Sequence, residues 1–140
     1  MVDLVRVDGW LLAAIRYSTG NSGWASLADV IDTADWLRVL EPTYDDVSFS
    51  FSRLKARDLI EVVISRGGRV RVRATPQAET LTSFLFGGSA WQPGDTLELV
   101  NKALGVAPYP QPEIEDRTLG RLPELSREVF NAAVAKSRIF

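Results

Sequence analysis

The spacing of apolar residues changes near Leu59, and this change constrains the fold more than any other feature of the chain. Before it, apolar residues recur every three or four positions, as on one face of an α-helix. After it, they alternate with charged residues, as in a strand with one buried face. Gly67 and Gly68 separate two such strands, 59–64 and 70–74, and predict a β-hairpin.

Three amphipathic helices are predicted before this hairpin. They are expected over residues 8–19, 26–40 and 43–58, the first of them capped by Asp8. Ser26 and Thr43 are each followed three residues later by an aspartate, Asp29 and Asp46, which is typical of a helix-capping box.

A break at residues 87–89, Gly-Gly-Ser, divides the remainder of the chain. Thr75-Pro76 predicts a fourth helix before the break, because proline fits the first helical position. We expect a first domain over 1–86 and a helical C-terminal extension over 87–140. The extension is expected to contain helices over 95–104 and from about 123, joined by an extended proline-rich stretch over 107–116. The expected fold class is mainly α with a small β-hairpin, an α+β fold.

The composition argues against most catalytic chemistry. The chain has neither cysteine nor histidine, which excludes disulfides, thiolate nucleophiles, Ser-His pairs and most zinc sites. It lacks a phosphate-binding loop and a nucleophile-elbow motif. We therefore expect a binding protein, not an enzyme, with no cofactor and no metal. It also lacks a signal-peptide pattern and any apolar run of about 20 residues, so a cytoplasmic location without membrane contact is expected.

Charge is spread unevenly along the chain. Residues 1–50 carry 3 basic and 8 acidic side chains, residues 51–86 carry 7 and 3, and residues 87–140 carry 6 and 7. The middle segment is thus the only basic one, in a chain of net charge −2. A local excess of this kind matters more for nucleic-acid binding than the total charge does.

The order of the expected elements over residues 8–86 resembles the winged helix-turn-helix superfamily of bacterial transcriptional regulators, such as the multiple-antibiotic-resistance-regulator and PadR types. The resemblance is carried by residues 24–30 (WASLADV), 51–60 (FSRLKARDLI) and 70–81 (VRVRATPQAETL). It implies a DNA-binding homodimer whose third helix enters the major groove while the hairpin arginines hold phosphates. Residues 95–140 would then supply a dimer or effector surface.

The resemblance also implies a set of DNA-contacting residues. They are Ser48, Ser52, Arg53, Lys55, Arg66, Arg69, Arg71 and Arg73. Asp45 and Asp46 depart from the pattern, because carboxylates at the start of the third helix are repelled by a phosphate-lined groove. Helix capping explains both, and contact with a basic partner is the alternative.

A second hypothesis is a protein-protein interaction module on the same scaffold, without DNA binding, because fold does not fix function. Residues 87–140 folded over the third helix would favour it.

Two further patterns are open to a structural or a functional reading. Asp29, Asp32 and Asp35 form an acidic stripe, read as a solvated helix face in preference to a divalent-metal site. The four tryptophans are expected in the core or in an interface.

Overall fold

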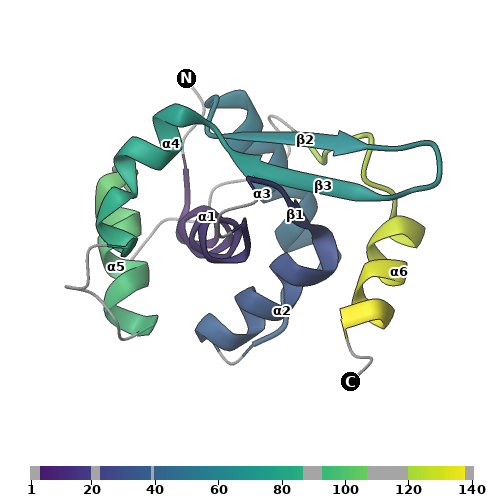
Figure 1. The fold of residues 1–140 in the computed structure, drawn as a ribbon, viewed down its shortest axis with the longest axis horizontal. Helices are drawn as coiled ribbons and strands as arrows, with labels where there is room; N and C mark the ends of the chain where they lie inside the picture. Colours follow the sequence, from purple (N-terminus) through teal and green to yellow (C-terminus); the bar gives the residue numbers. More distant parts are fainter. Residues whose placement is uncertain (1–3, 20–22, 39, 87–92, 107–119, 138–140) are drawn as a thin grey trace.

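The computed structural model describes residues 4–19, 23–38, 40–86, 93–106 and 120–137. Its elements, in chain order, are α1 (Arg6–Thr19), β1 (Ala25–Ser26), α2 (Leu27–Arg38), α3 (Tyr44–Ala56), β2 (Ile60–Ile64), β3 (Val70–Ala74), α4 (Pro76–Leu81), the 3-10 helix η1 (Ser83–Phe86), α5 (Pro93–Ala103) and α6 (Arg127–Ser137) (Figure 1). The described residues therefore form a mixed α+β fold, as the sequence predicts.

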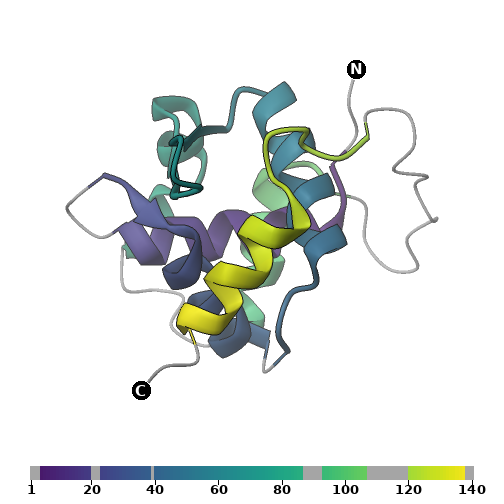
Figure 2. The ribbon, with the colours of Figure 1, turned by 90° about the vertical axis from the view of Figure 1, so that its right-hand side faces the viewer.

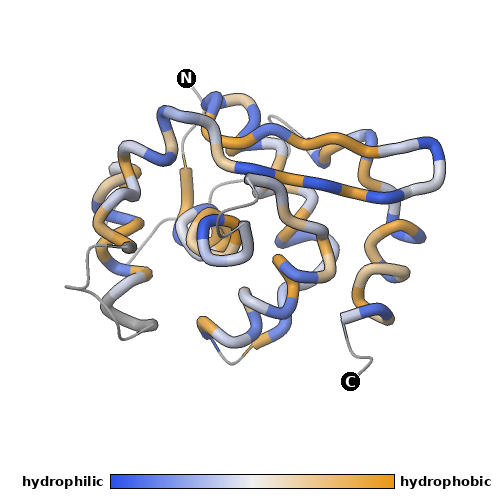
Figure 3. Tube along the Cα trace, viewed as in Figure 1, coloured by the Kyte–Doolittle hydropathy of each residue, from blue (hydrophilic) through white to orange (hydrophobic). Residues whose placement is uncertain are grey.

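The three strands form one antiparallel sheet in the order β1-β3-β2. The predicted hairpin is confirmed, with Ile64 opposite Val70, although its first strand begins at Ile60. Along β3, buried apolar residues alternate with arginines, and Figure 3 shows this alternation as orange and blue segments. One face of the sheet therefore joins the core and the other carries the arginines.

The predicted start signals of α3 and α4 are confirmed. The Thr43 hydroxyl accepts a hydrogen bond from the Asp46 backbone N–H at 3.0 Å, and the Asp46 carboxylate accepts one from the Thr43 N–H at 2.9 Å. At α4, Thr75 caps the helix and Pro76 takes its first position. These local contacts satisfy backbone donors that the first helical turn leaves without a partner.

Helix α1 begins at Arg6, two residues before the predicted start. Asp8 is therefore not the residue that precedes the helix. It lies within the first turn, where its carboxylate accepts a hydrogen bond from the Val5 N–H at 2.8 Å. Helix α6 begins at Arg127, later than the predicted residue 123. The predicted extended stretch, 107–116, and Trp91 lie outside the described residues.

Helix α1 is the centre of the packing. It lies between α2, α3, α5 and the sheet (Figures 1 and 2). Its residues 10–15 are all at most 2% exposed, and the Trp10 indole N–H donates to the Ala34 carbonyl oxygen at 2.8 Å. A helix that is apolar on all sides is expected in such a central position.

The C-terminal helices pack on elements from the first half of the chain. Helix α5 lies against α1, and α6 lies against α2. Val100, Leu104 and Phe130 thereby join the same apolar core as the residues of α1 to α3. Within the described parts of the chain, no helix combines the length and the apolar character needed to cross a membrane.

Candidate binding surfaces

The residues predicted to contact DNA differ widely in exposure. Lys55, Arg66, Arg69 and Arg71 are exposed, Ser52 and Arg73 are half-buried, and Ser48 and Arg53 are buried. In this structure, the buried side chains of Ser48 and Arg53 are therefore not accessible to a groove of DNA, unlike those of the exposed residues.

Residues 120–126, which we call the C-terminal strap, explain the burial of Ser48. The backbone N–H of Leu122 donates both to the Ser48 carbonyl oxygen at 3.2 Å and to the Ser48 hydroxyl oxygen at 3.1 Å. Ser48 is 0% exposed and Leu122 is 4% exposed. In Figure 2 this segment passes in front of α3 before it enters α6. The Ser48 end of the face expected to read bases is thus covered by the chain itself, whereas Lys55 at its other end is exposed.

Side chains from both segments reinforce this cover. The Tyr44 hydroxyl donates to the Leu125 carbonyl oxygen at 2.7 Å. Arg121 donates to the Asp45 carboxylate at 3.0 Å, and its guanidinium lies 5.0 Å from the centre of the Phe49 ring. The acidic start of α3 therefore faces a basic residue of its own chain.

Arg53 is buried because it binds Asp8. Its Nε lies 2.9 Å from one Asp8 carboxylate oxygen, and the Ser50 hydroxyl donates to the other at 2.6 Å. Burial raises the pKa of the Asp8 carboxyl, while the hydrogen bond and charge of Arg53 and the bond from Ser50 oppose this rise. The pair ties α1 to α3 and has a structural explanation that needs no ligand.

The hairpin carries the basic surface that remains exposed. Val63, Arg66, Arg69 and Arg71 form what we call the arginine face. None of its three arginines forms a salt bridge with any residue that the structure describes. Val63 pairs with Arg71 across the strands and is 52% exposed. Together with Arg69, these two residues line a hollow of about 330 Å³.

Arg73 differs from the other hairpin arginines. Its guanidinium lies 2.7 Å from the Glu61 carboxylate and 4.4 Å from the centre of the Trp24 ring. These two contacts already use part of the guanidinium. Arg73 therefore contributes less to an open basic surface than Arg69 or Arg71 does.

An acidic residue of the strap lies near the exposed lysine of α3. Lys55 lies beside a hollow of about 190 Å³ that Val62, Ile64 and Glu124 also line. Glu124 belongs to the strap, so a carboxylate shares this hollow with the lysine of α3. This arrangement weakens the attraction that a phosphate backbone would need along both elements.

Helix α2 carries the acidic stripe at its surface. Partial burial and the neighbouring carboxylates of Asp29 and Asp35 raise the pKa of Asp32. Among the described residues, no group of three or more acidic, histidine or cysteine side chains is placed to hold a metal ion. At the end of the same helix Trp36 is 63% exposed, whereas Trp10 is buried at 2% and Trp24 is half-buried.

Comparisons with protein-family models, with curated proteins and with solved structures found no match to this chain. The case for a function therefore depends on the two features described above. These are a third helix covered by the strap and a hairpin whose arginines face outward.

Leu122 and Arg121 are the residues of this region that the sequence did not single out. Their partners on α3 lie 74 and 76 positions earlier. The sequence offers one signal for such a contact: Asp45 and Asp46 leave an acidic site on α3 that a distant arginine satisfies. The acidic residues alone do not indicate which arginine of the chain pairs with them.

Proposed function

We propose that this chain is a winged-helix domain that serves as a protein-interaction module and does not read DNA through α3. The observation that carries the proposal is the strap on α3. In winged-helix regulators, the first residues of the third helix meet base edges in the major groove. Here Ser48 lies beneath Leu122, and Asp45 binds Arg121.

The order of elements supports the scaffold. Three helices precede a hairpin, and the short strand β1 pairs with β3 as the third member of the sheet. Helix α4 follows directly through the Thr75-Pro76 start. This is the succession that the resemblance to winged-helix regulators implies.

The arginine face is the proposed contact surface, and an acidic protein segment is the proposed partner. A guanidinium binds a carboxylate through two parallel hydrogen bonds, and arginine is enriched in protein interfaces. Val63, opposite Arg71 on the neighbouring strand, adds exposed apolar area to this face. One exposed apolar side chain adds a small favourable contact with a protein side chain and none with a phosphate.

Charge also favours a protein partner. Three unpaired arginines neutralise about three phosphates, which gives a slope of about −2.7 in the logarithm of affinity against that of salt. Such binding is weak at moderate salt, and phosphate contacts alone carry no sequence information. An acidic protein segment gains apolar contact in addition to the charge pairing.

The test is affinity capture from nuclease-treated extract on the immobilised full chain. Arg71→Glu reverses one charge on the arginine face, and Lys102→Glu reverses one exposed charge on α5 as a matched control. We expect the wild type and Lys102→Glu to retain the same acidic partner and Arg71→Glu to lose it. Capture that depends on nucleic acid, or that Arg71→Glu leaves intact, would overturn the proposal.

DNA binding through the hairpin is the second candidate, favoured by the unpaired state of Arg66, Arg69 and Arg71 among the described residues. Fluorescence anisotropy with a 20-base-pair duplex at low and moderate salt separates the two. Sequence-selective binding by a homodimer, lost in Arg71→Glu, supports the second candidate. Weak binding that is indifferent to sequence and disappears at moderate salt supports the first.

A further inference from the structure

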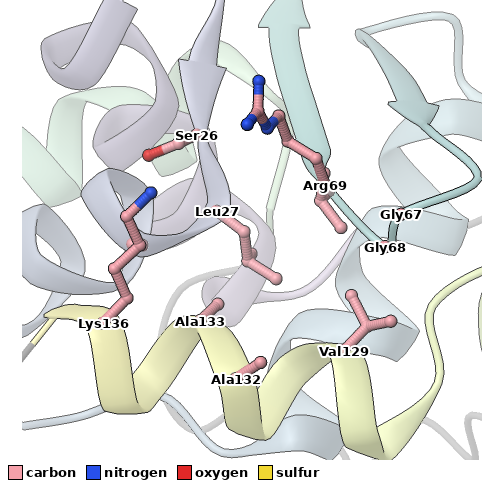
Figure 4. A pocket seen from close by; sticks show the side chains of 11 residues that line it. Ser26, Leu27, Gly67, Gly68, Arg69, Val129, Ala132, Ala133 and Lys136 are labelled. Atoms are coloured by element: carbon pink, nitrogen blue, oxygen red, sulfur yellow. The ribbon is translucent and has the colours of Figure 1, made fainter.

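A cavity of about 170 Å³ lies where the start of α2, the hairpin turn and α6 meet (Figure 4). Leu27, Val129 and Ala133 give it an apolar lining, whereas Ser26, Arg69 and Lys136 give it a polar edge. Figure 4 shows Lys136 extending from α6 toward Ser26, and Arg69 extending from the hairpin toward the strand that carries Ser26. The cavity thus has an apolar side and a cationic side.

The two cations at this edge have no acidic partner among the residues that the structure describes. Neither Arg69 nor Lys136 forms a salt bridge with a residue in the described ranges. Ser26 precedes α2, and its hydroxyl accepts a hydrogen bond from the Asp29 N–H at 3.2 Å. The positive end of the α2 dipole therefore adds to the two side-chain charges.

We propose that this cavity binds a small carboxylate with a short apolar tail. The carboxylate would accept hydrogen bonds from Arg69 and Lys136, and the tail would lie against Val129 and Ala133. Sites for drug-sized ligands measure about 300–1,000 Å³, so this smaller cavity suits a compact ligand. The proposal does not depend on the identity of any macromolecular partner.

The position of the cavity gives the ligand a second effect. It lies between the hairpin turn, where a side chain on Gly68 would contact Val129 at 3.3 Å, and the helix that continues from the strap. A bound carboxylate would bridge Arg69 and Lys136 and hold α6 against the hairpin. Ligand binding is therefore expected to raise the protection of α6 from hydrogen exchange.

The probe is hexanoate, titrated into the full chain by calorimetry and followed by NMR shifts of residues around the cavity. We expect saturable binding, at least tenfold tighter than that of hexan-1-ol, acetate or inorganic phosphate. Lys136→Gln and Arg69→Gln should each weaken it about tenfold, which is about 1.4 kcal/mol. Lys102→Gln removes an exposed charge outside the cavity and should leave hexanoate binding unchanged.

Ala133→Leu tests the apolar side, because a larger side chain there fills the space of the tail. It should abolish hexanoate binding while the NMR spectrum elsewhere is preserved. The proposal is overturned if hexanoate does not saturate, if hexan-1-ol or phosphate binds equally well, or if Lys102→Gln weakens binding as much as Lys136→Gln.

Discussion

Asp8 is the polar residue whose loss would disturb the core most. It is 0% exposed and accepts hydrogen bonds from Val5, Ser50 and Arg53. Burying two charges is costly, and the pair offsets that cost only while both members and their hydrogen bonds are in place. The surface pair of Arg121 and Asp45 carries no such penalty, because both side chains are about half exposed.

We predict that Asp8→Ala lowers the free energy of unfolding by about 3–5 kcal/mol, because Arg53 would remain charged and buried. Urea denaturation measures the loss. Asp45→Ala, which breaks the exposed pair with Arg121, is the matched control and should cost at most about 1 kcal/mol. Equal losses in the two variants would contradict the structural role given to Asp8.

Gly9 and Asn101 form a second sensitive pair. A Cβ atom on Gly9 would lie 1.9 Å from the Asn101 Oδ1, and that buried oxygen accepts no hydrogen bond within the described residues. We predict that Gly9→Ala destabilises the protein and that Asn101→Ala restores most of the loss. Thermal unfolding of the two single variants and the double variant tests this. Additive losses would show that the two residues do not interact.

At the scale of elements, the sequence predicted what neighbouring residues determine. The capping box of Thr43 and Asp46 spans one helical turn, and the hairpin follows from alternation along two adjacent strands. Both depend on residues close together in the chain, so both are readable without the fold.

The accessibility of the candidate site could not be predicted in the same way. Arg53 and Lys55 stand two positions apart on α3, yet one is buried and the other exposed. The difference arises from Asp8, 45 positions before Arg53. Ser48 is covered by Leu122, 74 positions later. Local periodicity contains no information on such distant partners.

Helix α2 carries a prediction about pH. In the folded protein the pKa of Asp32 is raised above its ordinary value of 3.8. The stability that this raised pKa contributes is therefore complete below pH 3.8 and is lost as the pH rises through the folded pKa. Asp32→Asn should therefore stabilise the protein by about 0.2–0.5 kcal/mol at pH 7 and have no effect at pH 3. Urea denaturation at the two pH values checks this. A larger effect at pH 3 than at pH 7 would contradict it.

At the scale of the whole molecule, two described elements carry charge of opposite sign at their surfaces. The hairpin bears three outward arginines, whereas α2 bears the acidic stripe and an exposed Trp36. Exposed tryptophan is costly and is enriched at the centre of protein interfaces. These two surfaces therefore offer contact chemistry in addition to the cavity, and neither of them includes the covered Ser48 of α3.

Weakening the contacts between the strap and α3 tests whether the strap is what covers this helix. We predict that Tyr44→Phe combined with Arg121→Ala increases hydrogen exchange in residues 120–126, because two of the contacts with α3 are lost. Duplex binding measured by anisotropy should not increase, since Asp45 and Asp46 remain at the start of α3. Arg127→Ala, which removes only the guanidinium 4.6 Å from the centre of the Tyr44 ring, serves as a milder control. A gain of sequence-selective binding that requires Ser52 and Lys55 would instead identify a DNA reader held closed by its own chain.

The separation of α3 from its strap also matters while the protein is being made. Ser48 is translated 74 residues before Leu122, and ribosomes add about 5–20 residues per second. The nascent chain therefore presents a bare α3 for about 4–15 s before the covering segment exists. In that interval the Tyr44 hydroxyl and the side of α3 around Ser48 are open to chaperones, although the strap covers them in the finished protein.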